Sequence, residues 1–553
     1  MDVGEIIETY ELSPFKKPIT RKSPDILKTK DSKKVHEKLR KKLCSKFVFS
    51  ATQSILDSLK IPATENEIKK RQEFFKNAKC DNEFLKDLRL PRPNWRPEYS
   101  IVVVTENDKM YSKLKTLGVP VSLLIQQHDV EELRDYDIVQ AIECDKFQML
   151  LEQLDNVITF ESIDDIYLER YLQKLSGWQH NIKVLEKHMD VSHLKELLGL
   201  IGKSSTDFTA EDVESTLQRI NENISEKLKS TSISGSVVFE MLDSGSLPQE
   251  IKSHVIEEIN FSGLPPEIFQ EGIPVKIDYE ELERQISLQE TSIHLSFAEK
   301  LKKNKDKLQR VPAYLRQLEI DILHRDFCSI MSVTPGDFPE FGELKLENCR
   351  NLLLKNPEPV SFHLDENNRC SILTGANSGG KTTLIEHIIQ VILLGQLGLP
   401  IDGKARVPVL NEIFYFAKNK GSMNQGAFET LLNKMASIKN AQNPIILADE
   451  IEAITEPGVA ADIISASAEF FVKKDFYLVF ATHLGKELAG NLPARTRVDG
   501  IEAQGLDEKF NLIIKRSPVL GKLAHSTPEL IIERLAQKTG DEYFRHLESH
   551  IKD

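Results

Sequence analysis

The sequence predicts a multidomain protein of mixed α and α/β class, with a mainly helical region, a small α/β module inside it and a C-terminal α/β sheet domain. Three observations lead to this prediction. The chain has 553 residues, which is enough for three or four domains. Long stretches between residues 166 and 308 carry apolar residues at helical spacing. Short β-branched runs alternate with amphipathic segments at about residues 99–164 and again after Pro335.

The first 98 residues are expected to form an arm followed by two helices. Three prolines before residue 30 indicate a short extended arm. From Lys33 to Leu59 apolar residues recur at helical spacing, which predicts one helix. In "IPATENEIKKRQEFFKNAK", Thr64 followed by an acidic first turn predicts the cap of a second helix.

The middle of the chain combines a small sheet module with long helices. Within residues 99–165, "YSIVVVTE", "GVPVSLLIQ" and "YDIVQAIE" are typical of strands and "KMYSKLKTL" of a helix. No Gly-x-Gly-x-x-Gly loop accompanies them, so no cofactor is assigned to this module. Farther on, long helical segments are interrupted by the Gly/Pro-rich stretch "FSGLPPEIFQEGIPVKID". This pattern predicts a lever that runs out and returns, with an ordinary helical bundle as the alternative.

Changes in composition mark where one predicted segment gives way to the next. No internal repeat or low-complexity tract is visible in the sequence. The five predicted segments are an N-terminal arm (1–30), the first part of a helical core (31–98), a small α/β module (99–165), helical core and lever arms (166–330) and a C-terminal sheet domain (331–553).

The composition argues against several classes of protein. No run of about 18 apolar residues is present, so neither a transmembrane helix nor a membrane partner is expected. The acidic and mixed first residues, "MDVGEIIETYELSPF", do not resemble a signal peptide. The six cysteines are scattered without a C-x-x-C pair, which argues against a disulfide framework or a zinc site. We therefore expect a cytoplasmic location, in a reducing compartment.

The charges of the chain give evidence both for and against nucleic acid as a binding partner. A formal net charge of −13 counts mildly against DNA as a partner, but DNA binding requires only a local basic stripe. Two such stripes are present, "KKVHEKLRKKLCSK" from Lys33 and "EKLKKNKDKLQR" from Glu299. Each of them is either a surface that contacts DNA or the solvated face of a helix.

One glycine-rich stretch fits a phosphate-binding loop. "GANSGGKT" matches G-x-x-x-x-G-K-[ST] and lies between a strand-like run, "CSIL", and a helix-like run, "TTLIEHIIQVILLGQLG". The glycines let successive backbone N–H groups point inward, and the following helix adds its positive end. A glycine turn beside a surface lysine is the alternative. The residues expected to bind ATP are Gly375, Asn377, Ser378, Gly379, Gly380, Lys381, Thr382 and Thr383.

Hydrolysis of ATP further needs a metal ligand and a group that orients water. Lys381 is expected to reach the β- and γ-phosphates, and the Thr382 hydroxyl to coordinate Mg²⁺. In "NPIILADEIEA", Asp449 ends a buried strand run and Glu450 follows directly. We expect Asp449 to hold the Mg²⁺ ion and Glu450 to polarise the attacking water. His483, at the end of the strand run "FYLVFATH", is a second candidate catalytic residue that senses or orients the γ-phosphate.

These motifs resemble those of the MutS family. "TGANSGGKTTLIEHI" is similar to the family's TGPNMGGKST, "ILADEIEAITEP" to its segment with the DE pair, and "VFATHLGKEL" to its FATHYxEL stretch. The resemblance covers roughly residues 340–535 and extends more weakly to the helical region. It implies a C-terminal ABC-like P-loop ATPase domain with ATP and Mg²⁺ as cofactors. It also implies a homodimeric DNA clamp, in which each subunit completes the nucleotide site of the other.

The chain departs from the family pattern where the neighbouring subunit's ATP would be contacted. The family's S-T-F-x-x-E stretch is "GAFETL" here, with Gly426 in the place of the serine. The resemblance therefore implies that the contact in trans comes from backbone N–H groups at the start of this helix. Asn424 and Gln425 are expected to add further donors. In the phosphate loop itself, Ala376 and Ser378 replace the family's Pro and Met.

The resemblance finally implies a role in DNA transactions. No wedge segment like G-x-F-Y-E is found, the chain leaves no room for full mismatch and connector domains, and no nuclease-like extension follows "LESHIKD". The chain therefore resembles the short branch of the family, which lacks the mismatch-recognition domain. We expect an ATPase clamp for branched or recombination DNA in repair, associated with the nucleoid and indifferent to single mismatches. The alternative is a nucleotide-switched protein-interaction module with little DNA affinity, whereas a small-molecule kinase would need an acceptor site that the sequence does not show.

Overall fold

The computed structural model describes residues 2–19, 24–201, 207–230, 249–375, 379–417, 425–450, 457–490, 492–506, 512–524 and 527–552. The chain forms two compact units. The first unit joins residues 1–86 to residues 317–553, and the second unit comprises residues 87–316. Helices and parallel sheets occur together, so the mixed class that the sequence predicts is confirmed. The division into five segments stays a prediction.

The first unit contains a six-stranded sheet in the order β12-β13-β14-β10-β15-β18. Neighbouring strands are parallel except for β18, which lies antiparallel at one edge. All residues of β13 and β14 are buried, because a parallel sheet is covered on both faces. In spatial order the strands are Glu412–Phe416, Pro444–Asp449, Tyr477–Ala481, Cys370–Gly375, Thr496–Ile501 and Val519–Leu520.

Alternate side chains of this sheet enter two separate cores. Leu373 of β10 packs in the core that contains α17 (Lys381–Gln396). Its neighbour Ile372 packs in the other core, together with α19 (Pro457–Val472). Successive residues of a strand point to opposite faces, so one helix covers each face. β10 is the strand before the predicted loop and α17 is the helix after it, as the sequence predicts.

The first unit also contains a four-stranded sheet, in the order β7-β11-β8-β9. β7 pairs in parallel with β11, whereas the other neighbours are antiparallel. Its strands are Glu340–Phe341, Lys404–Val407, Leu344–Cys349 and Val360–Leu364 in that order. The last elements of the chain are β16 (Ala503–Leu506), β17 (Leu512–Ile514), α21 (Thr527–Thr539) and α22 (Glu542–Lys552).

The N-terminal arm begins as a helix, so the prediction of an extended arm is wrong there. α1 (Val3–Thr9) starts after Asp2, whose carboxylate accepts a hydrogen bond from the backbone N–H of Glu5. The Glu5 carboxylate accepts one from the backbone N–H of Asp2 in return. Ile6 and Ile7 are fully buried in the core of the first unit. Reciprocal capping and burial stabilise this short helix, and the prolines that suggested extended backbone come later in the chain.

The segment predicted as one helix between Lys33 and Leu59 is two helices, α2 (Lys30–Leu43) and α3 (Ser50–Ser58). Asp326 separates them. Its buried carboxylate accepts hydrogen bonds from the backbone N–H groups of Val48 and the next residue, at 2.8 and 3.0 Å. These two N–H groups are thereby withdrawn from a continuous helix. A long-range contact has overridden the local apolar pattern.

The segment before α2 extends the edge of the six-stranded sheet. Leu27 forms a parallel bridge with Ile413 of β12, and α2 then packs against β12 and α17. The first helices of the chain therefore belong with its C-terminal sheet. The next helix, α4 (Glu65–Lys76), begins after Thr64 as predicted, and the Thr64 hydroxyl accepts a hydrogen bond from the helix's first turn.

In the second unit, four parallel strands form the small sheet that the sequence predicts, in the order β2-β1-β3-β4. Every residue of β1 and β3 is buried, and separate cores lie on the two faces. The predicted strands and the first helix are thus confirmed. In chain order the elements are β1 (Ile101–Thr105), α5 (Asp108–Thr116), β2 (Val121–Leu123), α6 (Gln127–Glu131), β3 (Ile138–Ile142), α7 (Gln148–Leu151) and β4 (Val157–Phe160).

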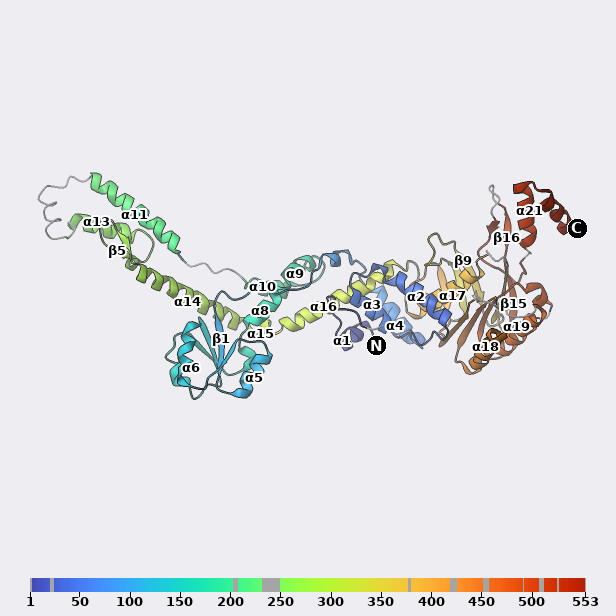
Figure 1. Ribbon diagram of the computed structural model, residues 1–553, viewed down its shortest axis with the longest axis horizontal. Helices are drawn as coiled ribbons and strands as arrows, with labels where there is room; N and C mark the ends of the chain where they lie inside the picture. The colour runs from blue at the N-terminus through green and yellow to red at the C-terminus, as the bar shows by residue number, and fades with distance from the viewer. Residues whose placement is uncertain are drawn as a thin grey trace. The chain divides into compact units, whose positions relative to one another are not determined.

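Within the second unit the chain runs out along α11 (Ala210–Ser230) and returns along α14 (Tyr279–Lys303) (Figure 1). Both helices cover segments that the sequence predicts as long helices. Their apolar side chains share one core with α13 (Gln249–Asn260) and with a hairpin of β5 (Phe269–Gln270) and β6 (Lys276–Ile277). The lever interpretation and the helical bundle both stay predictions.

The first of the helical stretches that the sequence predicts after residue 166 is divided at Gly177 into α8 (Glu169–Ser176) and α9 (Gln179–Leu185). A Cβ at Gly177 would lie 2.8 Å from the backbone carbonyl carbon of Arg92, so glycine is required where these two segments pass each other.

Within the part of the chain that the structure describes, no helix has both the length and the apolar character needed to span a membrane. Three further helices are short, namely α10 (Ser192–Leu198), α15 (Lys305–Gln309) and α20 (Gly485–Ala489). The long helix α16 spans Val311–Cys328.

Candidate nucleotide-binding site

The predicted phosphate-binding loop follows β10, inside the six-stranded sheet. Gly375 ends this strand with a φ of +131°, and a Cβ there would lie 2.5 Å from the carbonyl oxygen of Ile501. Backbone conformation and close approach both require glycine at this position. Gly380 has a φ of +95° directly before α17. Asn377 and Ser378, which the sequence also predicts to bind ATP, lie outside the described residues.

The first turn of α17 contains Lys381, Thr382 and Thr383. The first N–H groups of a helix have no partner within the helix, and the helix dipole is positive at this end. Lys381 is 3% exposed, and its amino group donates a hydrogen bond to the carbonyl oxygen of Gly375 at 2.5 Å. The lysine therefore connects the end of the loop to its beginning, where the N–H groups can bind an anion.

Thr382 and Asp449 are brought together although 67 residues separate them. The Thr382 hydroxyl oxygen lies 2.5 Å from Oδ2 of Asp449, which is the last residue of β13 and is 2% exposed. Among the described residues, no group of three or more His, Cys, Asp or Glu side chains is placed to hold a metal ion. A magnesium ion bound with a nucleotide needs only one or two protein oxygens, because phosphate and water supply the others. The hydroxyl and the carboxylate therefore fit Mg²⁺.

Glu450 follows β13 in a left-handed backbone conformation, with a φ of +48°, which is uncommon for a residue other than glycine. Its backbone N–H donates to the carbonyl oxygen of Ala481 in β14 at 2.9 Å, which fixes the turn. Its carboxylate Oε1 lies 3.2 Å from Nε2 of His483. Glu450 is 12% exposed and His483 38% exposed. The two predicted catalytic residues thus meet at the carboxyl ends of neighbouring parallel strands, where ligands of such sheets bind.

A cavity of about 310 Å³ lies beside the phosphate loop. Gly379, Gly380 and Thr383 line it on the loop side, and His387 and Arg516 line it as well. Sequence reasoning did not identify the last two residues. His387 could have been found from its spacing, because it lies one helical turn after Thr383 on the same face of α17. Arg516, which donates to the carbonyl oxygen of Gly379 at 3.4 Å, is too far along the chain to give such a signal.

The environment of His387 keeps its imidazole neutral. The side chain is 1% exposed, and burial lowers its pKa to about 4. Tyr415 of β12 is a second buried group near this edge of the sheet. Burial is the main cause that raises the pKa of its hydroxyl, and the negative charge of Asp449 adds to the effect. Both groups therefore stay uncharged at neutral pH and can act only as hydrogen-bond partners.

The helix predicted to contact a neighbouring subunit's ATP is α18 (Gln425–Ser437). Gln425 and Gly426 form its first turn, so the helix starts where the sequence predicts. Asn424 lies outside the described residues. The first N–H groups of any helix have no partner within it, and this is the property that the predicted contact in trans requires.

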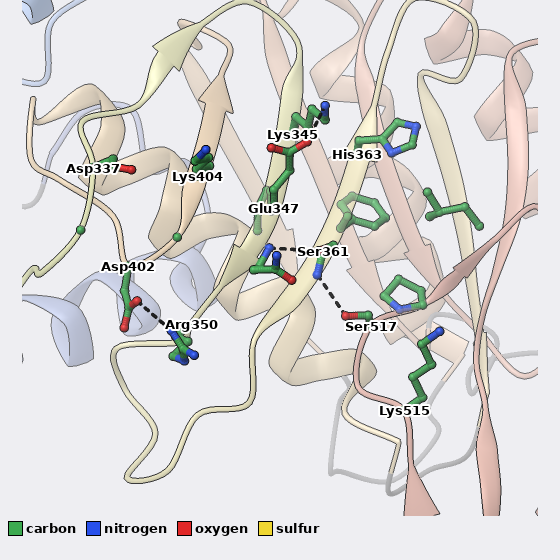
Figure 2. Close-up of a pocket in the computed structure, with 17 residues that line it drawn as sticks. Asp337, Lys345, Glu347, Arg350, Ser361, His363, Asp402, Lys404, Lys515 and Ser517 are labelled. Atoms are coloured by element: carbon green, nitrogen blue, oxygen red, sulfur yellow. Dashed lines mark hydrogen bonds and ion pairs between the residues drawn. The ribbon is translucent and has the colours of Figure 1, made fainter.

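A cavity of about 940 Å³ lies on the four-stranded sheet of the same unit (Figure 2). Its charged side chains are mostly paired with one another. Lys345 lies 2.7 Å from Glu347, and Arg350 lies 3.3 Å from Asp402. None of the residues predicted to bind ATP lines this cavity. Because the predicted ATP-binding residues Gly379, Gly380 and Thr383 line the smaller cavity beside α17, that cavity is the better candidate for a nucleotide.

Comparison with known proteins places the chain among its relatives. No family model matches it. Over 554 residues it is 30% identical to the protein named DNA-binding protein MutS2 of Pyrococcus furiosus, and the alignment covers 92% of this chain and 96% of that protein. The chain belongs to the MutS2 family. The resemblance to MutS proteins that the motifs indicate is thereby confirmed, and for this MutS2 chain it extends far beyond the nucleotide motifs.

Streptococcal relatives match a shorter part of the MutS2 chain. It is 31% identical over 173 residues to the protein named Endonuclease MutS2 of Streptococcus agalactiae, covering 29% of this chain and 22% of that protein. A protein of the same name in Streptococcus pyogenes is 30% identical over the same length. Since less than a quarter of the Streptococcus agalactiae protein is covered, the endonuclease in its name describes that protein and is not carried over to this chain.

Proposed function

We propose that this MutS2 chain is an ATPase of the ABC-like P-loop class that couples ATP binding and hydrolysis to DNA binding, as a homodimeric clamp on branched or recombination DNA. One observation carries the ATPase proposal: the hydroxyl–carboxylate contact of Thr382 and Asp449 lies at the same sheet edge as the Glu450–His483 contact. The DNA part is supported by the Pyrococcus furiosus relative, which is named a DNA-binding protein and is covered over 96% of its length.

In the proposed complex, the loop and the first turn of α17 bind the phosphates of ATP through backbone N–H groups. Lys381 exchanges its hydrogen bond to the Gly375 carbonyl for one to a phosphate oxygen. The nucleoside then occupies the cavity of about 310 Å³ beside Thr383. There, the neutral imidazole of His387 is a hydrogen-bond partner and not a charge.

Hydrolysis follows from the groups at the ends of β13 and β14. Thr382 and Asp449 would hold Mg²⁺, which would supply positive charge beside the phosphate oxygens. Glu450 orients a water molecule for attack on the γ-phosphorus and takes up a proton from it as the bond to the ADP oxygen breaks. His483 holds the Glu450 carboxylate in position through their 3.2 Å contact. Phosphate and ADP are the products, and the bond electrons leave with ADP.

The proposed site is completed by a second subunit. The N–H groups at the start of α18 are suited to contact the γ-phosphate bound by the partner, because a helix start binds anions without side-chain help. Gly426 supplies no hydroxyl for this contact, and Gln425 and Asn424 are proposed as additional donors. ATP bound in one subunit thereby stabilises the dimer, because it adds contacts across the interface.

For DNA, the basic stripe of α14 is the better supported of the two. Lys300, Lys302 and Lys303 near its end are exposed. In the other stripe, Arg40 and Lys38 form ion pairs with acids of the same unit, Arg40 with Asp57 and Lys38 with Glu386. When exposed lysines neutralise DNA phosphates, bound counterions are released, and this release supplies most of the non-specific DNA affinity. We therefore propose that the exposed lysines at the end of α14 contact DNA.

Two experiments test the proposed function. ATPase activity measured with duplex, mismatched, forked and four-way DNA is expected to rise most with the branched DNAs. Lys381→Ala is expected to lose ATP binding, and a loss of less than about threefold, or 0.7 kcal/mol, would contradict the phosphate site. If ATP binds but no DNA does at low salt, the alternative holds, namely a nucleotide-switched protein-interaction module. The net charge of −13 is the observation that favours this alternative.

A further inference from the structure

A second cavity of about 310 Å³ lies in the second unit, between the small sheet and α14. Its walls are mainly apolar and include Phe160 of β4, Leu168, and Leu295 and Leu301 of α14. Pockets that bind small molecules have this character, with apolar walls and a small number of polar groups. The volume is at the lower end of the range for such pockets, so a compact ligand fits.

Among the polar residues that line this cavity, Glu169, the first residue of α8, is almost fully buried, with 1% of the residue exposed. One carboxylate oxygen accepts a hydrogen bond from the Tyr99 hydroxyl at 2.8 Å. The other, Oε2, is buried and has no hydrogen-bond partner among the residues that the structure describes. Leaving a buried carboxylate oxygen without a donor costs free energy, which a donor from a ligand would recover.

The remaining charges of the cavity determine which donor fits. Asp165 and Glu299 add carboxylates to its lining, and Lys302 adds one positive charge. Asp165 lies 2.5 Å from Lys305, which balances it. Burial raises the pKa of Glu169, and a positive ligand would offset that penalty by favouring the ionised carboxylate. Since no described group of three or more His, Cys, Asp or Glu side chains is placed to hold a metal, an organic cation is the more suitable partner.

We propose that this cavity binds a small organic cation, an ammonium compound with a compact apolar body, whose N–H group donates to Oε2 of Glu169. The apolar body lies against Phe160 and the leucines of α14. This proposal is independent of the ATP site, and it assigns a ligand to the α/β module for which the sequence gives no cofactor.

A ligand in this cavity would lie where α14 packs against the small sheet module. Phe297 of α14 packs against Tyr99, with ring centroids 6.0 Å apart, and Tyr99 is the residue that binds Glu169. Trp95 contacts the same phenylalanine at 6.2 Å. A ligand between Glu169 and α14 therefore adds contacts where the module holds this long helix. A ligand that binds only while α14 is packed against the module stabilises that packing.

The test uses the full chain with isotope-labelled isoleucine and leucine methyl groups, titrated with 2-phenylethylamine and, separately, with the uncharged 2-phenylethanol. We expect saturable shifts at Ile158, Leu168, Leu295 and Leu301 with the amine, with a Kd of about 1 mM or lower. The alcohol is expected to bind about tenfold more weakly, because it carries no positive charge to pair with the Glu169 carboxylate. Absence of saturable shifts at these residues with the amine overturns the proposal, as does equal binding of the two probes.

Three variants separate a ligand site from a structural role. Glu169→Gln keeps the shape of the side chain and is expected to weaken amine binding about tenfold and to remove the preference over the alcohol. Leu295→Trp fills the cavity from a position that is 39% exposed, so it is expected to abolish binding of both probes in a folded protein. Glu152→Gln, an exposed position of the same module, is the matched control and should leave both affinities unchanged. An unchanged amine affinity in folded Leu295→Trp contradicts the assignment even if Glu169→Gln fails to fold.

Discussion

The Thr382 hydroxyl lies 2.5 Å from the Asp449 carboxylate, so the first turn of α17 and the end of β13 meet at one point beside the phosphate loop. Neither residue is in a position to move far, since Asp449 is 2% exposed and Thr382 is part of a helix. In the proposed ATP complex, these two oxygen atoms would be the protein's ligands to Mg²⁺. The partner oxygens would come from phosphate and water.

The first prediction concerns the metal. Thr382→Ala and Asp449→Asn each remove an oxygen ligand, so the Mg²⁺ concentration for half-maximal ATPase activity should rise about tenfold or more. ATPase assays over a Mg²⁺ series, with EDTA as the zero point, measure this. Asp462→Asn, an exposed carboxylate on α19, is the control and should keep the wild-type requirement. An unchanged Mg²⁺ requirement in both site variants would remove these residues from the metal site.

The second prediction concerns the water-orienting pair. Glu450→Ala should bind Mg-ATP but hydrolyse it at least about a hundredfold more slowly. His483→Ala should have a smaller effect, because His483 acts through the Glu450 carboxylate at 3.2 Å. The double variant should therefore be no slower than Glu450→Ala alone. Single-turnover hydrolysis and a separate nucleotide-binding assay distinguish the two steps. Near-normal turnover in Glu450→Ala would move the catalytic role to another group.

The third prediction concerns assembly. Because the start of α18 is proposed to complete the partner's site, ATP should convert monomers into dimers, and activity per subunit should rise with protein concentration. Light scattering on the Glu450→Ala protein with saturating Mg-ATP measures the dimer without turnover. A protein that stays monomeric at micromolar concentration under these conditions would rule out a shared site and leave a nucleotide switch within one chain.

The fourth prediction concerns DNA. Replacing Lys300, Lys302 and Lys303 by glutamate should weaken binding to four-way DNA and lower the slope of log affinity against log salt by about one for each phosphate that the protein no longer neutralises. Lys69→Glu, an exposed lysine on α4, is the control. Wild-type protein should bind a G·T mismatch no better than matched duplex of equal length and salt. A clear mismatch preference would contradict the interpretation of this chain as a binder of DNA structure.

The fifth prediction concerns stability. The buried Asp326 carboxylate accepts hydrogen bonds from two backbone N–H groups after α2, from the Thr52 hydroxyl at 2.6 Å and from the Asn82 amide at 3.0 Å. Asp326→Ala leaves these donors without an acceptor, so the free energy of unfolding should fall by about 3–5 kcal/mol. Urea denaturation measures it. Asp321→Ala on the same helix, at a half-buried position, should cost less than about 1 kcal/mol. Equal effects would mean that the bend between α2 and α3 does not depend on this carboxylate.

The sequence alone determined the parts of the candidate site that are made locally. A phosphate loop is a contiguous stretch between a strand and a helix, so its glycines, Lys381 and Thr382 could be predicted from spacing, and Gly375 and Gly380 have the positive φ values that such a loop needs. The ends of β13 and β14 were predictable for the same reason. A buried apolar run followed by a polar residue marks a strand end whatever the rest of the chain does.

The motifs predicted that Thr382 and Asp449 serve one metal ion, but only the tertiary structure shows these two residues in contact and decides the other contacts between distant segments. The contact of Thr382 with Asp449 spans 67 residues, and the bend held by Asp326 depends on hydrogen bonds that span 274 to 278 residues. The unpartnered oxygen of Glu169 likewise depends on where α14 and the small sheet pack. Hydrophobic periodicity reports which face of an element is buried but not against what it is buried. Contacts between distant segments are fixed by the packing of whole elements and leave no local pattern in the sequence.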